Sequence, residues 1–223
     1  MNLPCRRRHS GRILHAVTAT SPTIIVVAAG QGSRFKGTEH KLSQPMGGST
    51  VLGSTLRHAV ESRLPVLLVT TSPFVAAASR ELAMRDIVVL SAAEAARGMG
   101  HSIAAGVAER ASASGWLVLP GDMPLVRPST LRAVASALDT HPVVYAQHRG
   151  RRGHPVGFAA ELYSELVLLD GDEGARRIVA RYPVRGEEVD DPGVLLDIDT
   201  REDLETLQQA VPHEGADVRD PGR

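Results

Sequence analysis

Short apolar runs alternate with amphipathic stretches along most of this chain. The apolar runs are rich in valine and bounded by Gly, Pro or Asp, which is typical of buried strands. They cover residues 23–29, 65–71, 86–90, 115–120 and 142–147, and a late run covers 194–199. Helical patterns lie over residues 51–63, 73–85, 101–113, 127–140 and 200–210. Thr200 opens the last of these as its N-cap, and Asp203 follows three residues on, which predicts a motif close to a capping box.

Strands that are apolar on both sides and alternate with helices predict an α/β domain. The expected architecture is a Rossmann-like open, mostly parallel sheet with helices on both faces. Ligands of such sheets bind at the carboxyl ends of the strands. The pattern is irregular through residues 148–158, where no regular element is predicted. We expect one folded domain over residues 22–210, a disordered or misassigned extension over 1–21, and a disordered tail over 211–223.

Composition narrows the classes of partner. The chain has 223 residues, of which 43% are hydrophobic, so it can bury a sizeable core. Acidic and basic residues number 25 each, and this balance gives no field that would attract nucleic acid or an anionic membrane. Cys5 is the only cysteine, which excludes a disulfide framework and fits a reducing cytoplasm. The longest apolar run is too short to cross a bilayer.

A glycine-rich stretch follows the first predicted strand. It resembles neither a dinucleotide fingerprint, because Phe35 stands where a third glycine is needed, nor a Walker loop. Small residues there leave room for backbone amides to approach phosphates, and Arg34 and Lys41 add positive charge. We therefore predict a phosphate site, with an ordinary solvated loop as the alternative. Its residues are Ala28, Ala29, Gly30, Gln31, Gly32, Ser33, Arg34 and Lys41.

Three aspartates stand at predicted strand ends. Asp122, in "LPGDMP", follows a buried strand, and a carboxylate there can carry a divalent ion. Asp197 and Asp199 are two residues apart on a predicted strand, so they share one face and need a cation between them. We expect all three to be metal ligands. The alternatives are a turn-capping role for Asp122 and a solvated strand end for the other two.

Six motifs in this order resemble the MobA-like nucleotidyltransferases, most closely the branch that makes molybdopterin cytosine dinucleotide. They are "VVAAGQGSRF…K", "GMGHSIAAGV", "PGDMP", "GHPVGF", "GDEGAR" and "DIDTREDL", and together they span about residues 24–207. The resemblance implies Mg²⁺-dependent nucleotidyl transfer, with Mn²⁺ as a substitute. An acceptor phosphate attacks the α-phosphate of a nucleoside triphosphate, and pyrophosphate leaves. Such transfer needs positioning and charge neutralisation more than a protein nucleophile.

The resemblance also implies roles for particular residues. Arg34, Lys41 and Asp122 would be catalytic, and Gly98 and Ser102 would contact the base and ribose. Arg152, His154 and Asp172 match the acceptor side. The basic run that also holds His148, Arg149 and Arg151 would suit a phosphate-bearing pterin, and a solvated arginine turn is the alternative.

Two departures from the family pattern bear on the substrate. The segment between Arg34 and Lys41 is longer than usual, so Lys36 is an alternative phosphate contact. Ala29 stands where the guanylyl branch has glycine, which favours CTP over GTP.

The expected partners are a nucleoside triphosphate, molybdopterin and a xanthine-dehydrogenase-type molybdoenzyme. GTP with the same pterin, or a sugar phosphate as acceptor, is the first alternative. A nucleotide-binding cofactor carrier with little turnover is the second. Trp116 is predicted to be a core residue.

Overall fold

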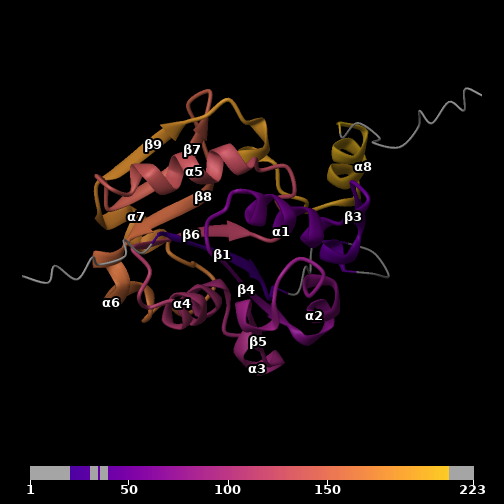
Figure 1. The fold of residues 1–223 in the computed structure, drawn as a ribbon, viewed down its shortest axis with the longest axis horizontal. Helices are drawn as coiled ribbons and strands as arrows, with labels where there is room; N and C mark the ends of the chain where they lie inside the picture. Colours follow the sequence, from indigo (N-terminus) through magenta and orange to yellow (C-terminus); the bar gives the residue numbers. More distant parts are fainter. Residues whose placement is uncertain (1–20, 31–34, 36–39, 211–223) are drawn as a thin grey trace, which may run out of the picture.

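A seven-stranded sheet forms the centre of the protein (Figure 1). The computed structural model describes residues 21–30, 35 and 40–210, apart from the side chains of 209 and 210. In spatial order the strands are β5 (Ile87–Leu90), β4 (Val66–Thr71), β1 (Thr23–Ala28), β6 (Gly115–Pro120), β8 (Arg151–Ala159), β7 (Val143–His148) and β9 (Val184–Glu188). Strands β2 (Pro45–Met46) and β3 (Ser49–Thr50) form a separate two-stranded sheet.

The sheet is mostly parallel, as predicted. Strand β1 pairs in parallel with β4 on one side and with β6 on the other, and only β8 runs against its described neighbours. The chain therefore builds β4 and β5 on one side of β1 before it crosses to form β6 on the other. This reversal of direction between β1 and β6 is a topological switch point, where open α/β sheets bind ligands.

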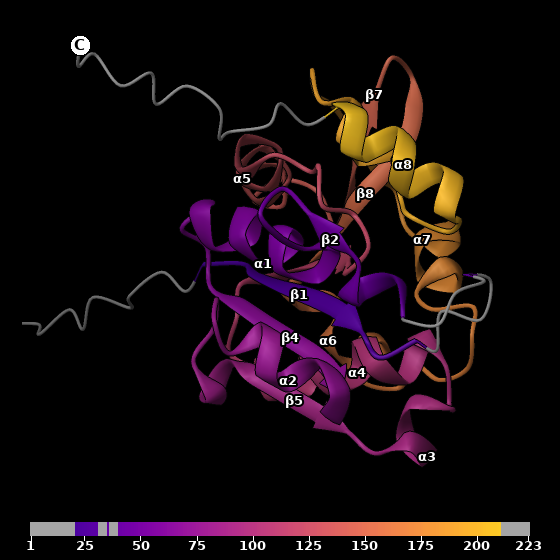
Figure 2. The same ribbon diagram turned by 90° about the vertical axis from the view of Figure 1, so that its right-hand side faces the viewer.

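Helices cover both faces of the sheet. The α-helices are α1 (Val51–Glu61), α2 (Ser72–Ala78), α3 (Ala92–Ala95), α4 (Met99–Glu109), α5 (Pro128–Ala137), α6 (Tyr163–Leu166), α7 (Arg176–Arg181) and α8 (Arg201–Ala210). The 3₁₀ helices are η1 (Lys41–Ser43), η2 (Met84–Asp86), η3 (Ala160–Leu162) and η4 (Pro192–Leu195). Helices α1 and α5 lie on one side of the sheet, and α4 and α6 on the other (Figure 2).

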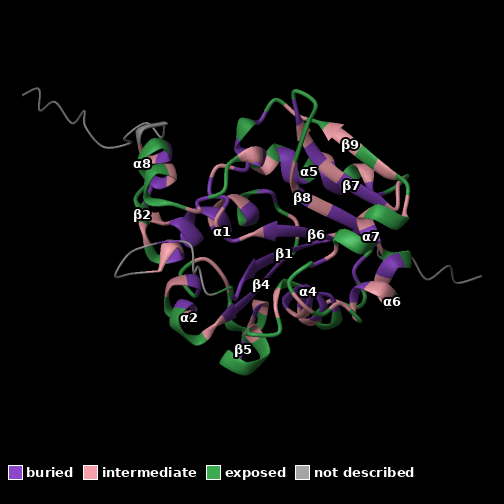
Figure 3. Ribbon diagram, turned by 180° about the vertical axis from the view of Figure 1, so that it is seen from behind, coloured by how far each residue is buried: buried purple, intermediate pink, exposed green. Residues whose placement is uncertain are grey.

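Alternation along β1 divides the core into two layers. Ile24, Val26 and Ala28 pack in the layer that includes α1, α5 and α8. Ile25, Val27 and Ala29 pack in the layer that includes α4 and α7. Strands apolar on both sides are needed because neither face meets water, and the central strands are buried along their length (Figure 3).

Helix termini are capped by local side chains. The hydroxyl of Thr50 accepts a hydrogen bond of 3.0 Å from the amide of Gly53 at the start of α1. At the start of α8, the amide of Asp203 donates to Thr200 Oγ1 over 3.1 Å, and the amide of Thr200 donates to Asp203 Oδ2 over 2.7 Å. The reciprocal bonds confirm the predicted capping motif, with Asp in place of the usual Glu.

Three predicted elements need correction. Residues 194–199 form no strand: they include the end of η4, and the amide of Ile198 pairs with the carbonyl of Asp122. The helix predicted over 73–85 ends at Ala78 and continues as turns into η2. The irregular stretch 148–158 contains β8, which is the longest strand of the sheet.

Strand β8 escaped prediction because glycines and a proline interrupt its apolar pattern. Gly153 lies under η4, where a Cβ atom would come 2.2 Å from the carbonyl oxygen of Val194. The peptide bond between His154 and Pro155 is cis. The composition of this segment therefore reflects packing against η4 as well as strand pairing.

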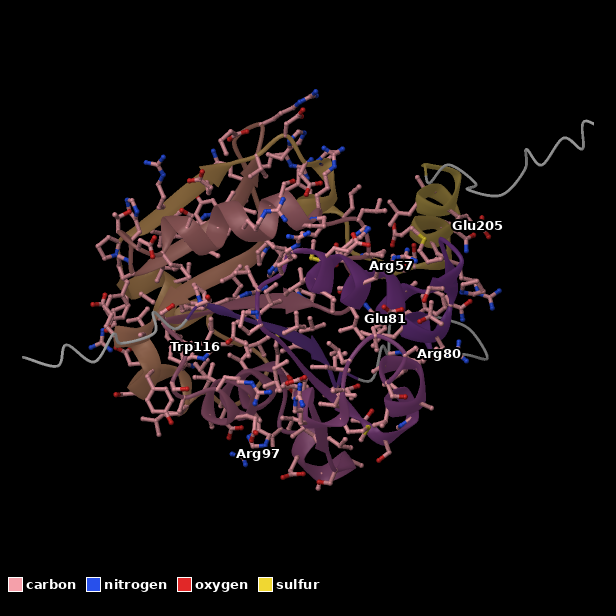
Figure 4. The ribbon with its side chains drawn as sticks, viewed as in Figure 1. Arg57, Arg80, Glu81, Arg97, Trp116 and Glu205 are labelled. Carbon is pink, nitrogen blue, oxygen red and sulfur yellow. The ribbon has the colours of Figure 1, made fainter. Side chains whose placement is uncertain are left out.

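Trp116 is fully buried, which confirms its predicted place in the core (Figure 4). Its indole N–H donates a hydrogen bond of 3.0 Å to the carbonyl of Arg110. Among the described residues, no helix combines the length and apolar character required to span a membrane.

Candidate active site

The candidate site lies at the carboxyl ends of β1 and β6. Gly30 follows β1, and Asp122 follows β6. The two strand ends are tied together, because the amide of Gly121 donates to the carbonyl of Val27 over 2.9 Å. Thr55 of α1 also holds this turn, because its hydroxyl donates a hydrogen bond of 3.0 Å to the carbonyl of Gly121. The predicted phosphate loop and the predicted metal ligand therefore follow two strand ends that are hydrogen-bonded to each other.

Three carboxylates converge at this point. Asp122, Asp197 and Asp199 each offer an oxygen that lies within 4.8 Å of the others. The amide of Ile198, between two of them, donates to the backbone carbonyl of Asp122 over 3.1 Å. The two later aspartates reach Asp122 because the chain crosses the end of β6 there, and not because they share a strand as the sequence predicted.

Lys41 provides the positive charge at this cluster. Its Nζ atom lies 2.6 Å from Asp122 Oδ2 and 2.9 Å from Asp199 Oδ1, and its side chain is 12% exposed. Burial lowers the pKa of Lys41, but the charges and hydrogen bonds of the two aspartates outweigh that effect and raise the pKa above its ordinary value. The ammonium group is therefore charged at neutral pH.

The donor set fits a hard divalent cation. The second oxygen of Asp122, Oδ1, is buried and has no hydrogen-bond partner among the described residues. An ionised oxygen without a partner is costly inside a protein, and a cation would satisfy it. Carboxylate oxygens are the ligands that Mg²⁺ and Mn²⁺ prefer.

His40 is a site residue that the sequence reasoning missed. Its Nδ1 atom accepts a hydrogen bond of 3.2 Å from the amide of Leu42, so the proton is on Nε2, which donates to the carbonyl of Gly30 over 3.1 Å. The ring also packs edge-on against Phe74, with centroids 4.8 Å apart. His40 thus connects the end of the predicted phosphate loop near Lys41 to Gly30 near its start, a contact that no local pattern encodes.

The segments that carry Gly98 and Asp172 are paired with each other. The amide of Gly171 donates to the carbonyl of Arg97 over 2.9 Å, and the amide of Gly100 donates to the carbonyl of Gly171 over 2.8 Å. The guanidinium of Arg97, labelled below α4 in Figure 4, also contacts Asp170 at 3.2 Å. The segment expected to bind the nucleotide and one expected on the acceptor side therefore form a single structural unit.

Ser102 lies on the first turn of α4 and is 4% exposed. Its hydroxyl lies 3.5 Å from the carbonyl of Gly98, at the outer limit of a hydrogen bond.

The two predicted acceptor residues on β8 have different surroundings. His154 is partly buried, and its Nδ1 atom is fully buried and has no hydrogen-bond partner among the described residues. The negative charges of Asp122 and Asp197 interact electrostatically with its ring. Burial lowers the pKa of His154 more than those charges raise it. Arg152 is exposed, and its guanidinium lies 4.3 Å from the ring centroid of Tyr145. The structure thus brings His154, but not Arg152, to the aspartate cluster.

The remaining predicted loop residues, Gln31, Gly32, Ser33, Arg34 and Lys36, lie outside the described residues. Ala28 and Ala29 are buried at the end of β1, and the hydroxyl of Thr70 donates to the carbonyl of Ala28 over 3.1 Å.

Comparison with known proteins identifies the family of the chain. Residues 24–187 match the MobA-like NTP transferase domain. The chain is 28% identical over 207 residues to the purine catabolism protein PucB of Bacillus subtilis, a match that covers 86% of this chain and 98% of PucB.

Solved structures show the same fold. Rv0371c of Mycobacterium tuberculosis is 30% identical with a TM-score of 0.73, covering 86% of this chain and 100% of that one, and it has also been solved in complex with manganese. A nucleotidyl transferase from Methanothermobacter thermautotroptrophicus is 24% identical with a TM-score of 0.70, covering 85% and 97%. With a family domain matched over most of its length, the chain belongs to the MobA-like NTP transferases and is a nucleotidyltransferase.

Proposed function

We propose that this enzyme transfers CMP from CTP to molybdopterin, with Mg²⁺ or Mn²⁺. In the reaction, an oxygen of the pterin phosphate forms a bond to the α-phosphorus of CTP. The bond between that phosphorus and the bridging oxygen of the β-phosphate breaks, and pyrophosphate leaves with the electron pair. The product is a dinucleotide form of the cofactor, which a xanthine-dehydrogenase-type enzyme would receive.

The observation that carries the proposal is the cluster of Lys41 and three aspartates at the switch point between β1 and β6. Phosphoryl transfer develops charge on phosphate oxygens, and catalysis consists largely of holding and neutralising them. A cation on Asp122, Asp197 and Asp199 would supply that neutralisation to the triphosphate. The manganese complex of Rv0371c supports a divalent ion in this family.

The triphosphate would lie along the loop that begins at Gly30. Arg34 and Lys41 are the cations expected to hold its oxygens, and the backbone amides of residues 30–33 would complete the cradle. The hydrogen bond from His40 to the carbonyl of Gly30 supports this role, because it fixes one end of the loop against the other.

The preference for CTP rests on Ala29 and its surroundings. The methyl group of Ala29 packs in the core layer that includes α4, whose amino end carries Gly98 and Ser102. A base placed between β1 and the start of α4 would meet that methyl group. A pyrimidine needs less room there than a purine, which favours CTP.

Molybdopterin is proposed as the acceptor because of β8 and the 170–174 segment. His154 lies near the aspartates, and Asp172 lies against Gly98, so both could approach a phosphate-bearing acceptor beside the nucleotide. The named role of PucB in purine catabolism agrees with a cofactor for a purine-oxidising molybdoenzyme.

The test is pyrophosphate release by the purified protein with Mg²⁺. CTP, GTP, ATP and UTP are compared with and without molybdopterin, and a sugar 1-phosphate serves as an alternative acceptor. We expect release only with CTP and molybdopterin. Asp122→Asn should lower kcat at least about 100-fold, whereas Asp139→Asn, which changes an exposed aspartate after α5, should leave it unchanged.

Each contrary result has a definite meaning. Release with GTP and pterin would overturn the interpretation of Ala29 and keep the chemistry. Release only with the sugar phosphate would overturn the acceptor. The protein would instead be a carrier of the cofactor if it delivered cofactor to a molybdoenzyme without turnover, and if Asp122→Asn delivered it equally well.

A further inference from the structure

The ammonium group of Lys41 contacts two of the three carboxylates that are suited to a metal ion. Its Nζ atom contacts one oxygen of Asp122 and one of Asp199 at 2.6 and 2.9 Å. Both carboxylates belong to the three-aspartate group suited to a cation. We infer that Lys41 is the resident counter-cation of the metal-free enzyme, and that a divalent ion binds these aspartates by displacing it.

Electrostatics make the two arrangements compete. Mg²⁺ binds carboxylate oxygens at about 2.1 Å, so an ion on the oxygens that now contact Nζ would lie within about 5 Å of the ammonium group. Two positive charges at that separation repel strongly in a partly buried site. The side chains involved are mostly shielded, with exposed fractions of 12% for Lys41 and 16% for Asp122, so water screens this repulsion little.

The position of Lys41 gives the displaced ammonium group a destination. Lys41 is the first residue of η1 and directly follows His40, which is hydrogen-bonded to Gly30. If the proposed function is correct, the triphosphate lies beside this point. Phosphate oxygens would then replace the carboxylates as partners of Lys41, while the metal takes the aspartates. Metal and nucleotide should therefore bind cooperatively.

The chemistry of lysine suits such an exchange. A lysine ammonium is a compact charge on a flexible four-carbon stem, so it can change partners by rotating its side chain. An arginine at this position would hold two carboxylate oxygens in a fixed fork and would release them less readily. The chain uses arginine for nearly all its basic positions and has only two lysines, Lys36 and Lys41.

The first experiment measures Mn²⁺ affinity without nucleotide, by calorimetry or by the EPR signal of free Mn²⁺. We expect Lys41→Met to bind Mn²⁺ about tenfold more tightly than the wild type, because the competing charge is gone. Lys41→Arg, which keeps the charge, should bind no more tightly than the wild type. Equal affinity of Lys41→Met and wild type would overturn the inference.

The second experiment observes the wild-type protein, and a variant is needed only to assign its signals. Labelling with [ε-¹³C]lysine should yield two NMR signals, which a Lys36→Arg variant assigns. During a Mg²⁺ titration without nucleotide, the Lys41 signal should shift with the midpoint of metal binding. An unmoved Lys41 signal at saturating metal would overturn the displacement.

These outcomes separate this inference from the proposed function. If Asp122→Asn binds Mn²⁺ as well as the wild type, the metal site itself is wrong. If Asp122→Asn loses the metal but Lys41→Met gains no affinity, the metal site stands and only the exchange is wrong. Neither result depends on which nucleotide or acceptor the enzyme uses.

Discussion

Gly98 lies directly against Asp172: a Cβ atom added to Gly98 would come 2.5 Å from Asp172 Oδ1 and 2.5 Å from the carbonyl carbon of Gly171. The two residues are far apart in the sequence, and backbone hydrogen bonds hold their segments together on each side. Gly98 also has a φ of +94°, which disfavours any side chain. The start of α4 therefore requires glycine at position 98, because the backbone conformation disfavours a side chain and because Asp172 and Gly171 leave no room for a Cβ atom.

Gly98→Ala should separate these segments. We expect a loss of about 1–3 kcal/mol in unfolding free energy from the backbone conformation, and a KM for the nucleotide raised at least about tenfold, a 1.4 kcal/mol effect. Denaturant unfolding and steady-state kinetics measure the two effects. Gly150→Ala is the matched control, because Gly150 has a φ of +74° but open space around it. A similar rise in KM for Gly150→Ala would show that strain alone is responsible.

His40→Asn tests the tie between His40 and Gly30. Asparagine can still cap η1, as His40 Nδ1 does for Leu42, but its side chain is too short to make both contacts. We expect the KM for the nucleotide to rise about tenfold with kcat nearly unchanged, because the loop is less well ordered before binding. Kinetics with varied nucleotide would refute the role of His40 if KM stayed at the wild-type value.

Thr55→Val tests the support beneath Asp122. Valine has the shape of threonine but leaves the carbonyl of Gly121 without its 3.0 Å hydrogen bond. We expect the free energy of unfolding to fall by about 1–2 kcal/mol, with Mn²⁺ affinity reduced several-fold. Thr55→Ser keeps the hydroxyl and is the control. Unchanged metal affinity in a destabilised Thr55→Val protein would confine the role of Thr55 to stability.

His154 should make stability fall in mild acid. Burial places its folded pKa below the ordinary value of 6.5, so the unfolded chain takes up a proton before the folded protein does. The neutral ring therefore contributes its full share of the unfolding free energy above pH 6.5, and this contribution is lost as the pH falls from 6.5 through the folded pKa. Denaturant unfolding between pH 8 and 5 should show a smaller decline for His154→Gln than for the wild type. An identical decline in both proteins would show that other groups cause it.

The local patterns of the chain were sufficient for the type and order of most elements. Strands β1, β4 and β6 were predicted because buried parallel strands must be apolar on both faces, and that requirement is visible in a single segment. Strands β5 and β7 are less completely buried and were predicted from their short valine-rich runs. Strand β8 was not, because the crossing of η4 over Gly153 shapes its composition as much as strand pairing does. The family could be recognised because its motifs keep their order along the chain.

The arrangement of charges within the site required the tertiary structure. The sequence identified Lys41 and the three aspartates as candidates and predicted a cation between the aspartates, and the family resemblance assigned Lys41 to the triphosphate. The ion pairs of Lys41 with two of these aspartates were not predicted. That Lys41 lies on Asp122 and Asp199, that His40 reaches Gly30, and that Gly98 lies against Asp172 all depend on contacts between distant segments. Periodicity and turn chemistry are properties of neighbouring residues, whereas these contacts exist only after β1, β6 and the crossing segments have packed together.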